Sequence, residues 1–281
     1  MGPIIFIKEL SGFSGCKINL YSKEGKLFVR KISSSLEYNN RLKMQMEKQK
    51  FFFDNLKNER ISTPEIYDSG YTNTSLFFFD MEYIPSITLI EHVLNSPPDK
   101  LKKISEILLE IINLMKSKRS ANKIDLRSKA KSKIEEINKK IGKVLENLFD
   151  NYNLNSNFFP ELFETSCHGD LTFENILYNE KNKKYYLIDF LDSFVEHYWL
   201  DIVKMYQDLE GRWYLLRNPE IDQKLMEVKM YFISEYLKQK LINDDYWKFH
   251  SFLLKLNFAR ILPYTNGEKF NQVLKKIREI N

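Results

Sequence analysis

Cysteine is scarce in this chain of 281 residues, which contains only Cys16 and Cys167. Two cysteines cannot make a network of disulfides, and such sparing use is typical of a reducing compartment. We therefore expect a cytoplasmic protein that is stabilised by the burial of apolar side chains rather than by covalent links.

Long apolar runs are missing as well. The most apolar helical stretch, 104–115, contains Glu106 and Glu110, which excludes a helix that spans a bilayer. The N-terminal run Ile4–Ile7 is apolar, but it is too short for a signal peptide and no basic segment precedes it. We expect a soluble protein without a membrane partner.

The chain also lacks a strong charge of either sign, because 38 acidic side chains nearly balance 43 basic ones and the net charge is +5. Lysine is spread along the chain and does not gather with aromatic residues, as it does on surfaces that bind nucleic acid. Nucleic acid is therefore not the expected partner. The chain does have 43% hydrophobic and 14% aromatic residues, enough for one large domain or two packed lobes.

Short strands separated by turn residues are predicted for the first part of the chain, as an antiparallel sheet. One segment, Leu36–Leu56, has no Gly or Pro and is rich in Glu, Lys, Met and Gln, so we predict a helix that lies against this sheet. The predicted strands are Ile4–Ile7, Lys17–Tyr21, Lys26–Ile32, Ile66–Gly70 and Leu76–Tyr83.

The sequence changes character near Pro85, after which helical patterns predominate. Leu101–Met115 is amphipathic, and Lys131–Leu148 is strongly charged, as a solvated helix would be. We therefore predict an α+β fold of two lobes. The N-terminal lobe, residues 1–84, is an antiparallel sheet with one helix, and the C-terminal lobe, residues 85–281, is mainly helical.

Three oxygen-bearing side chains stand near one predicted turn. Asp170 and Asn175 lie five positions apart on a loop, and a β hairpin over 176–190 returns the chain to Asp189. Phosphoryl transfer needs such a group: a carboxylate to accept the proton of the attacking hydroxyl, and hard oxygen ligands for Mg²⁺. An ordinary turn with a solvated aspartate is the alternative, and the joint spacing favours the chemical interpretation.

This pattern, His-Gly-Asp at 168–170 followed by Asn175 and by Asp189 before a phenylalanine, resembles the aminoglycoside phosphotransferase and choline kinase-like family. The resemblance implies a protein-kinase-like two-lobed fold and an ATP-dependent kinase that acts on a small molecule. It also implies that Asp170 is the catalytic base and that Asn175 and Asp189 are the Mg²⁺ ligands.

Two further residues receive structural roles from the resemblance. His168 would brace the catalytic loop, and Asp201 would hydrogen-bond that loop, although an ordinary surface aspartate on a helix fits the sequence equally well. The sequence also departs from protein kinases, because Phe190-Leu191-Asp192 follows Asp189 where Asp-Phe-Gly would be expected, and no Ala-Pro-Glu follows. An activation loop switched by phosphorylation is therefore not expected.

The resemblance places the phosphate-binding groups in the N-terminal lobe. Lys31, at the end of a predicted strand, would hold the α- and β-phosphates, and its helix partner would be Glu47 in preference to Glu37. Gly12 and Gly15 would let the backbone of a phosphate-covering loop approach the nucleotide. A plain hairpin turn and a pair of surface charges are the alternative interpretations.

The predicted hinge between the lobes lies at the end of the last strand before Pro85. Main-chain groups of Glu82 and Ile84 would pair there with adenine. The resemblance therefore implies ATP and Mg²⁺ as cofactors, and the sequence leaves GTP open as the donor.

The phosphate acceptor is expected to be a small hydroxylated molecule, such as a sugar, an amino-alcohol or an aminoglycoside. Acidic and aromatic residues in the C-terminal helices could hold a cationic acceptor, and core packing is their alternative role. A protein kinase and a catalytically silent nucleotide-binding module stay open as alternative functions. The residues of this predicted acceptor wall are Glu196, Tyr198, Trp199, Asp208, Arg212, Trp213 and Tyr214.

Overall fold

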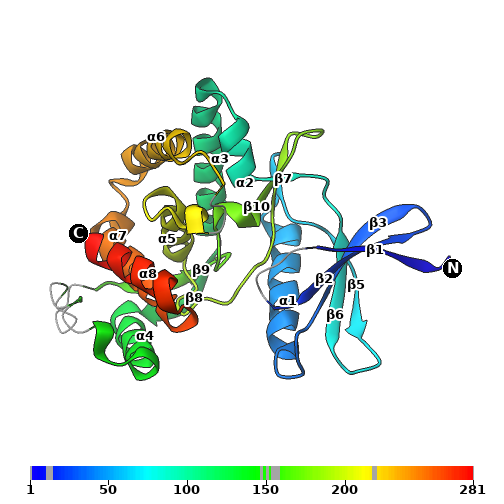
Figure 1. Ribbon diagram of the computed structural model, residues 1–281, viewed down its shortest axis with the longest axis horizontal. Coiled ribbons are helices and arrows are strands. Elements are labelled where there is room, and N and C mark those ends of the chain that lie inside the picture. Colours follow the sequence, from blue (N-terminus) through cyan, green and yellow to red (C-terminus); the bar gives the residue numbers. More distant parts are fainter. Residues whose placement is uncertain are drawn as a thin grey trace. The chain divides into compact units, whose positions relative to one another are not determined.

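A computed structural model describes residues 2–10, 15–145, 148–149, 152, 159–216 and 220–280 (Figure 1). The chain forms two compact units. The sheet unit consists of residues 1–89 together with 175–192. The helical unit consists of residues 90–174 and 193–281.

The sheet unit is built on a five-stranded antiparallel sheet in the order β1-β2-β3-β6-β5. Strands β2 and β3 are joined by a two-residue turn in which Glu24 and Gly25 both have positive φ, which suits the right-handed twist of the flanking strands. The bounds are β1 Ile4–Leu10, β2 Lys17–Lys23, β3 Lys26–Ile32, β5 Ile66–Tyr71 and β6 Phe77–Glu82.

A second sheet of the same unit has the order β4-β11-β10-β7. Its centre is the antiparallel hairpin β10–β11, which pairs with β7 on one side and, in parallel, with β4 on the other. The hairpin carries the chain to Asp189. The bounds are β4 Ile61–Ser62, β7 Ile87–Thr88, β10 Ile176–Asn179 and β11 Lys184–Leu187.

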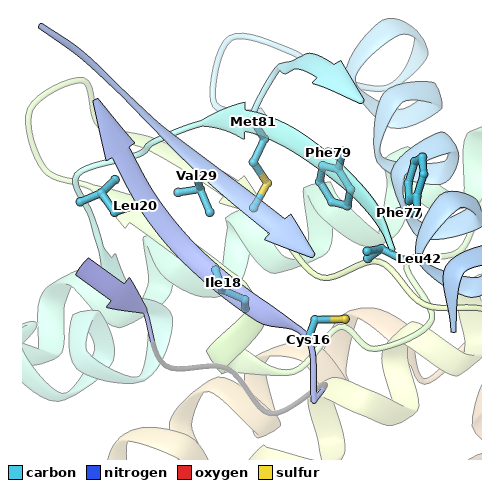
Figure 2. Packing of buried hydrophobic residues seen from close by; sticks show 8 residues of the cluster. All are labelled: Cys16, Ile18, Leu20, Val29, Leu42, Phe77, Phe79 and Met81. Carbon is cyan, nitrogen blue, oxygen red and sulfur yellow. The ribbon is translucent and has the colours of Figure 1, made fainter. Parts of the chain in front are cut away.

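Helix α1 (Asn39–Asn55) covers the five-stranded sheet through its contact with β6. Its buried residues recur at intervals of three or four, which places them on one face of the helix. Alternate residues of β2 and β6 turn toward the same core, because successive side chains of a strand point to opposite faces. Figure 2 shows this core, formed by Cys16, Ile18, Leu20, Val29, Leu42, Phe77, Phe79 and Met81.

The helical unit contains the other described α-helices and a two-stranded antiparallel sheet, β8–β9, whose strands are separated in the chain by α4. Helix α2 (Leu89–Asn95) begins at the boundary with the sheet unit. The other bounds are α3 Pro98–Ser117, β8 Arg119–Asp125, α4 Leu126–Ile141, β9 Glu161–Thr165, α5 Tyr198–Leu209, α6 Gln223–Leu241, α7 His250–Ala259 and α8 Gly267–Glu279.

Helix α5 is the centre of this unit. It packs against α3, α6 and α7, and nearly all of its residues are buried, including the charged Asp201 and Asp208. A helix that is buried on every side presents its polar side chains only to specific partners, because water is excluded. The hydrogen-bond partners of Asp201 and Asp208 therefore show which segment of the chain α5 holds in place.

The predicted α+β class, with an N-terminal antiparallel sheet, one helix and a largely helical C-terminal region, is confirmed. The strand pair β8–β9 was not predicted, because β8 is mostly exposed and polar and lacks the alternation of a half-buried strand. Helix α4 ends at Ile141 rather than near Leu148, since Gly142 has a φ of 72° and leaves the helical conformation. The lobe boundary at residue 84 stays a prediction.

None of the described helices is both long enough and apolar enough to cross a bilayer.

One buried lysine ties α6 to the end of α2. The ammonium of Lys229 donates to the main-chain oxygens of Val93, Leu94 and Ser96 at 3.1, 2.6 and 2.7 Å. The last carbonyls of a helix have no partner within the helix, and a cation is favourable there. Lys229 therefore supplies the C-terminal cap of α2 from a distant part of the chain.

We expect Lys229→Met to lower the free energy of unfolding by about 2 kcal/mol, because buried carbonyl oxygens lose a charged donor. Urea unfolding measures this change. The matched control is Lys224→Met on the exposed side of the same helix, for which a change within about 0.5 kcal/mol is expected. Equal effects of the two substitutions would contradict the capping role.

Candidate functional site

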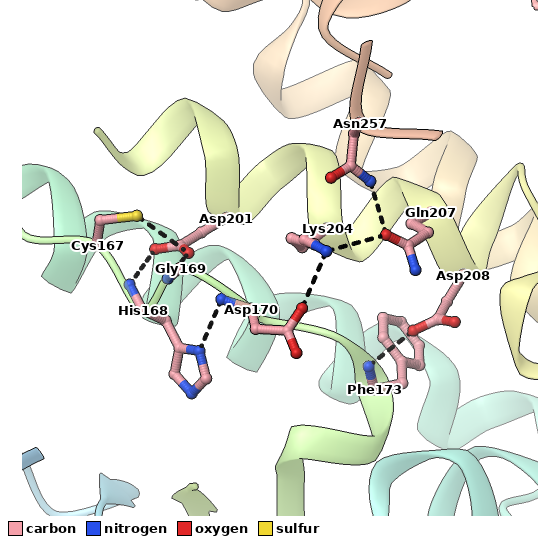
Figure 3. Close-up of polar contacts among 10 residues, drawn as sticks. All are labelled: Cys167, His168, Gly169, Asp170, Phe173, Asp201, Lys204, Gln207, Asp208 and Asn257. Atoms are coloured by element: carbon pink, nitrogen blue, oxygen red, sulfur yellow. Dashed lines mark hydrogen bonds and ion pairs between the residues drawn. The ribbon is translucent and has the colours of Figure 1, made fainter. Parts of the chain in front are cut away.

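The loop that carries Asp170 is held by one buried carboxylate from α5. Asp201 is fully buried, and its two oxygens accept the main-chain N–H groups of His168 at 2.8 Å and Gly169 at 2.9 Å. The Cys167 thiol donates to the same carboxylate at 3.4 Å (Figure 3). Gly169 has a φ of 86°, a conformation that glycine adopts without strain. Asp201 thus contacts three consecutive residues and fixes the backbone of two of them, His168 and Gly169.

His168 is fully buried beside this carboxylate. Its Nδ1 accepts the main-chain N–H of Asp170 at 3.2 Å, so the ring is hydrogen-bonded within its own turn. The main-chain oxygen of Asp170 accepts the N–H of Thr172 at 2.8 Å. These contacts restrict the backbone on both sides of Asp170, as the predicted bracing role of His168 requires.

Asp170 itself reaches the surface. Its side chain is 26% exposed, and Oδ1 lies 3.0 Å from Nζ of Lys204, which is 13% exposed. Lys204 stands three positions after Asp201, so both side chains belong to the same face of α5. Sequence reasoning missed Lys204, since a single lysine on a predicted helix carries no signal that distinguishes it from a surface charge.

A chain of polar contacts continues from Lys204 into α7. The Lys204 ammonium donates to Oε1 of Gln207 at 3.3 Å, and Asn257 donates to the same oxygen at 2.6 Å. Figure 3 shows these side chains in sequence, from Asp170 through Lys204 and Gln207 to Asn257. The surroundings of Asp170 are therefore built by α5 and α7 together.

A second carboxylate of α5 fixes the far end of the loop. Asp208 is buried, and its Oδ2 accepts the main-chain N–H of Phe173 at 2.8 Å. Asp201 and Asp208 are seven positions apart, which is two turns of helix on one face. The loop from Cys167 to Phe173 is thus anchored at both ends by one rigid helix.

Most members of the expected acceptor wall are buried, which favours the alternative role in core packing. Its members on α5 are core residues, because Tyr198, Trp199 and Asp208 are buried and Asp208 is used by the loop. Tyr214 is likewise buried, and Arg212 forms an ion pair with Glu227 at 2.8 Å. These buried aromatic residues pack in the interior of the helical unit.

In the sheet unit, Lys31 and Asp189 meet. Lys31 is 2% exposed, and its Nζ lies 2.7 Å from Oδ1 of Asp189, 158 positions later in the chain. The φ of Asp189 is 60°, a conformation that few residues other than glycine adopt and that aspartate tolerates better than most. Non-glycine residues in this region often mark functional positions.

Asn175 lies beside Asp189 at the open end of the β10–β11 hairpin. Ile176 pairs with Leu187, and the main-chain oxygen of Asn175 accepts the N–H of Ile188 at 3.0 Å. The two residues offer an amide oxygen and a carboxylate. Mg²⁺ in nucleotide enzymes takes one or two such ligands from the protein and the rest from phosphates and water, so this pair fits it. Among the described residues, no group of three His, Cys, Asp or Glu forms a complete cage.

Gln45, rather than Glu47, is the residue of α1 that reaches Lys31. Oε1 of Gln45 lies 3.4 Å from Nζ of Lys31, and its amide nitrogen donates to the hydroxyl of Tyr38 at 3.1 Å. Glu47 is exposed, because two positions along a helix turn a side chain by about 200° to the opposite face. The expected pairing of Lys31 with Glu47 is thus corrected to Gln45.

Four further residues were predicted to contact the nucleotide through their backbone. Gly12 lies outside the described residues, while Gly15 has a φ of 74° and open space around its α-carbon. Glu82 ends β6, and its N–H donates to the oxygen of Glu65 at 2.9 Å. Ile84 is buried, and its oxygen accepts the hydroxyl of Ser86 at 2.9 Å. The nucleotide, metal and catalytic roles of all these residues stay predictions.

Comparison with solved structures shows which fold the chain has. An apo form of a thermostable mutant of aminoglycoside phosphotransferase APH(4)-Ia is similar over 98% of this chain and 93% of its own, with a TM-score of 0.62 and 11% identity. Aminoglycoside-3'-phosphotransferase of type VIII gives a TM-score of 0.52 and 13% identity, with the same shares covered. At these identities the likeness establishes the protein-kinase-like fold.

A ternary complex of a thermostable mutant of APH(4)-Ia with ADP and hygromycin B has a TM-score of 0.53 and 12% identity, over 93% of this chain and 95% of that one. At the level of sequence, residues 95–207 match the ecdysteroid kinase-like family. This segment includes Asp170, Asn175 and Asp189. No curated protein sequence matches the chain. The resemblance to aminoglycoside phosphotransferases inferred from the motif is confirmed in the fold.

The residue that caps the N-terminus of α5 should make the stability of the protein depend on pH. His197 caps the N-terminus of this helix, with Nδ1 accepting the N–H of Trp199 at 3.3 Å, and burial lowers its pKa to about 4. In the unfolded chain histidine takes up its proton near pH 6.5, so between about pH 6.5 and 4 the unfolded state binds more protons. Stability should therefore fall by about 2–3 kcal/mol as the pH falls through this range.

His197→Asn keeps a capping side chain but does not titrate. We expect this variant to lose less stability than the wild type between pH 6.5 and 4, while the two proteins differ by no more than about 1 kcal/mol at pH 8. Urea unfolding at a series of pH values measures both. Parallel pH profiles of the two proteins would show that another group causes the acid destabilisation.

Proposed function

We propose that this protein transfers the γ-phosphoryl group of ATP to a hydroxyl of a small molecule, with Asp170 as the base. The observation that carries the proposal is the ion pair between the buried Lys31 and Asp189, at 2.7 Å. A buried lysine is rare unless it is paired, and here its partner is the predicted metal ligand at the end of a hairpin. In a kinase-like fold both residues would contact the nucleotide, which supports the proposal.

The sheet unit would bind the nucleotide. Lys31 would hold the α- and β-phosphates, with Gln45 and Asp189 fixing its ammonium in place. Asn175 and Asp189 would hold Mg²⁺, which would neutralise charge on the phosphates when bound. The Glu82 oxygen and the Ile84 N–H would pair with the base, since the Glu82 N–H is used by Glu65. The preference for ATP over GTP is part of this proposal.

The helical unit would supply the base and the acceptor site. The acceptor oxygen would attack the γ-phosphorus, its proton would pass to the Asp170 carboxylate, and the bond from the γ-phosphorus to the bridging oxygen would break to release ADP. Asp201, His168 and Asp208 would act by holding the loop in place. In this proposal residues 1–84 form the nucleotide lobe, and residues 85–281 form the catalytic and acceptor lobe.

Removing the base tests the reaction directly. We expect Asp170→Asn to lower kcat for acceptor-dependent ATP consumption by about 10²- to 10⁴-fold, because the amide cannot take up the proton. The assay uses a panel of sugars, amino-alcohols and hydroxy acids with ATP and Mg²⁺.

Asp192→Asn, an exposed change of the same kind, is the control that should keep wild-type turnover. Turnover by Asp170→Asn at the wild-type rate would eliminate Asp170 as the base. Labelling of proteins from ATP, with no small acceptor consumed, would favour a protein kinase instead.

Two matched changes on α1 test the nucleotide site. Gln45→Met removes the second contact of Lys31, and we expect the KM for ATP to rise by about three- to tenfold. Glu47→Gln changes an exposed side chain two positions away, and the KM should stay within about twofold of wild type. Steady-state kinetics at saturating acceptor measures both values. The opposite ranking would restore Glu47 as the partner of Lys31.

A further inference from the structure

The ammonium of Lys204 lies against the proposed base. Its Nζ is 3.0 Å from Oδ1 of Asp170, and the two side chains are 13% and 26% exposed. Solvent and salt screen a partly buried ion pair less than an exposed one, so the charge of Lys204 acts directly on the carboxylate. A carboxylate has two oxygens, so a cation can hold one of them while the other takes up a proton.

Lys204 stands between two buried carboxylates along α5. Asp201 is three positions before it and Asp208 is four positions after it, so all three side chains lie on one face of the helix. Both aspartates accept hydrogen bonds from neutral main-chain N–H groups, which leave their negative charges in place. Negative charges nearby disfavour the ionised form of a carboxyl group, and a positive charge favours it. Lys204 therefore offsets the repulsion that these two carboxylates exert on Asp170.

Other groups around Asp170 also carry charge or can titrate. Arg260, which follows α7, acts on it through charge, and the buried ring of His168 accepts its main-chain N–H at 3.2 Å. The thiol of Cys167 is buried in the same loop. A substitution at Lys204 leaves all of these groups in the chain, so a difference between wild type and variant reports the loss of the ammonium.

Two buried amides hold the ammonium of Lys204 in place. Oε1 of Gln207 accepts from Nζ of Lys204 at 3.3 Å and from Nδ2 of Asn257 at 2.6 Å. Gln207 and Asn257 are 2% and 1% exposed, so the protein rather than water supplies these hydrogen bonds. Figure 3 shows that the contact with Asn257 turns the oxygen of the Gln207 amide toward the ammonium.

We propose that Lys204 is a positioning residue for the base: its ammonium holds Oδ1 of Asp170 and keeps the carboxylate charged until it takes up the proton of the acceptor hydroxyl. This inference rests on the proposed kinase function and adds a residue to its machinery. Lys204 keeps its own proton throughout, and Gln207 and Asn257 act by holding the ammonium. The cation comes from α5 and not from the loop that carries the base.

The first experiment compares pH profiles of acceptor-dependent ATP consumption at saturating ATP and Mg²⁺. The reaction requires the ionised carboxylate, so kcat falls on the acid side as Asp170 takes up a proton. Without the ammonium the carboxyl group holds its proton up to a higher pH, and Lys204→Met should move this acid limb upward by about 1 pH unit or more. The KM for ATP should stay within about twofold of wild type, because Lys204 acts through the base. Melting temperatures at each pH verify that both proteins are folded.

Two further substitutions separate the charge of Lys204 from its hydrogen bonds. Lys204→Arg keeps the charge and should retain the wild-type acid limb. Lys204→Gln keeps a donor without the charge, and its acid limb should move as in Lys204→Met. The matched control is Lys116→Met, which removes a lysine from an ion pair with Asp244 at 2.7 Å in the same unit and should leave the acid limb in place.

A double variant tests whether Lys204 acts through Asp170. In the Asp170→Asn background, Lys204→Met should change the residual kcat by no more than about twofold, because residues that act as a unit have non-additive effects. A further loss of tenfold or more would overturn the inference, as would a wild-type acid limb in Lys204→Met or Lys204→Gln. A raised KM for ATP with the acid limb in place would make Lys204 a contact of the nucleotide instead.

Asn257→Leu extends the test to the support of the ammonium. This change removes the donor to Gln207 together with Oδ1, which has no hydrogen-bond partner in the described part of the chain, so the variant should melt close to the wild type. Its acid limb should move in the same direction as that of Lys204→Met. Asn257→Leu takes the place of Lys204→Met in every comparison if the latter fails to fold.

A second measurement needs no acceptor. The protein is labelled at the carboxyl carbon of aspartate, and NMR follows the titration of Asp170, whose signal is identified by its loss in Asp170→Asn. Without nucleotide or Mg²⁺, the midpoint of this titration should lie about 1 pH unit or more higher in Lys204→Met than in wild type. Equal midpoints would overturn the inference whether or not an acceptor is known.

The two proposals fail separately. If Asp170→Asn abolishes turnover while Lys204→Met keeps the wild-type acid limb, the positioning role falls and the kinase function stands. If the titration of Asp170 depends on Lys204 and no acceptor supports ATP consumption, the control of this carboxylate by Lys204 stands and the kinase function falls.

Discussion

The buried carboxylate of Asp201 is the interaction on which the geometry of the site depends. This carboxylate accepts hydrogen bonds from the main-chain N–H groups of His168 and Gly169. Because Asp201 is fully buried, water does not reach these groups to take its place as the acceptor. A main-chain turn held in this way keeps its conformation without a ligand, which is the preorganisation that positioned catalysis requires. The same helix provides Asp208 at the end of the loop and Lys204 beside Asp170. Helix α5, at the centre of the helical unit, therefore also supports the candidate site.

In the sheet unit, a strand and a hairpin, rather than one helix, bring the polar residues together. There a strand places Lys31 in the interior, and the hairpin β10–β11 returns Asp189 to it. The two residues are far apart in the chain, so their ion pair exists only because the two sheets and α1 form one compact unit. Gln45 completes this arrangement as a neutral residue, which leaves Asp189 as the anion that balances the buried lysine.

Polar groups in the helical unit fall into two kinds. Some are well supplied with partners from the protein, such as Lys229, which caps α2. Others, such as Arg260 and Asn257, keep buried polar atoms without a partner in the described part of the chain. The first kind contributes to stability, and the second kind lowers it.

The sequence by itself determined the fold class and the loop residues, because turn chemistry, strand alternation and the spacing of Asp170, Asn175 and Asp189 are local properties. It could not determine which residue of α1 meets Lys31, since a shift of two positions changes the face of a helix and only packing selects Gln45. It could not find Lys204 either. The place of Lys204 beside Asp170 depends on how α5 packs in the helical unit, and burial of a charge is decided by the tertiary structure alone.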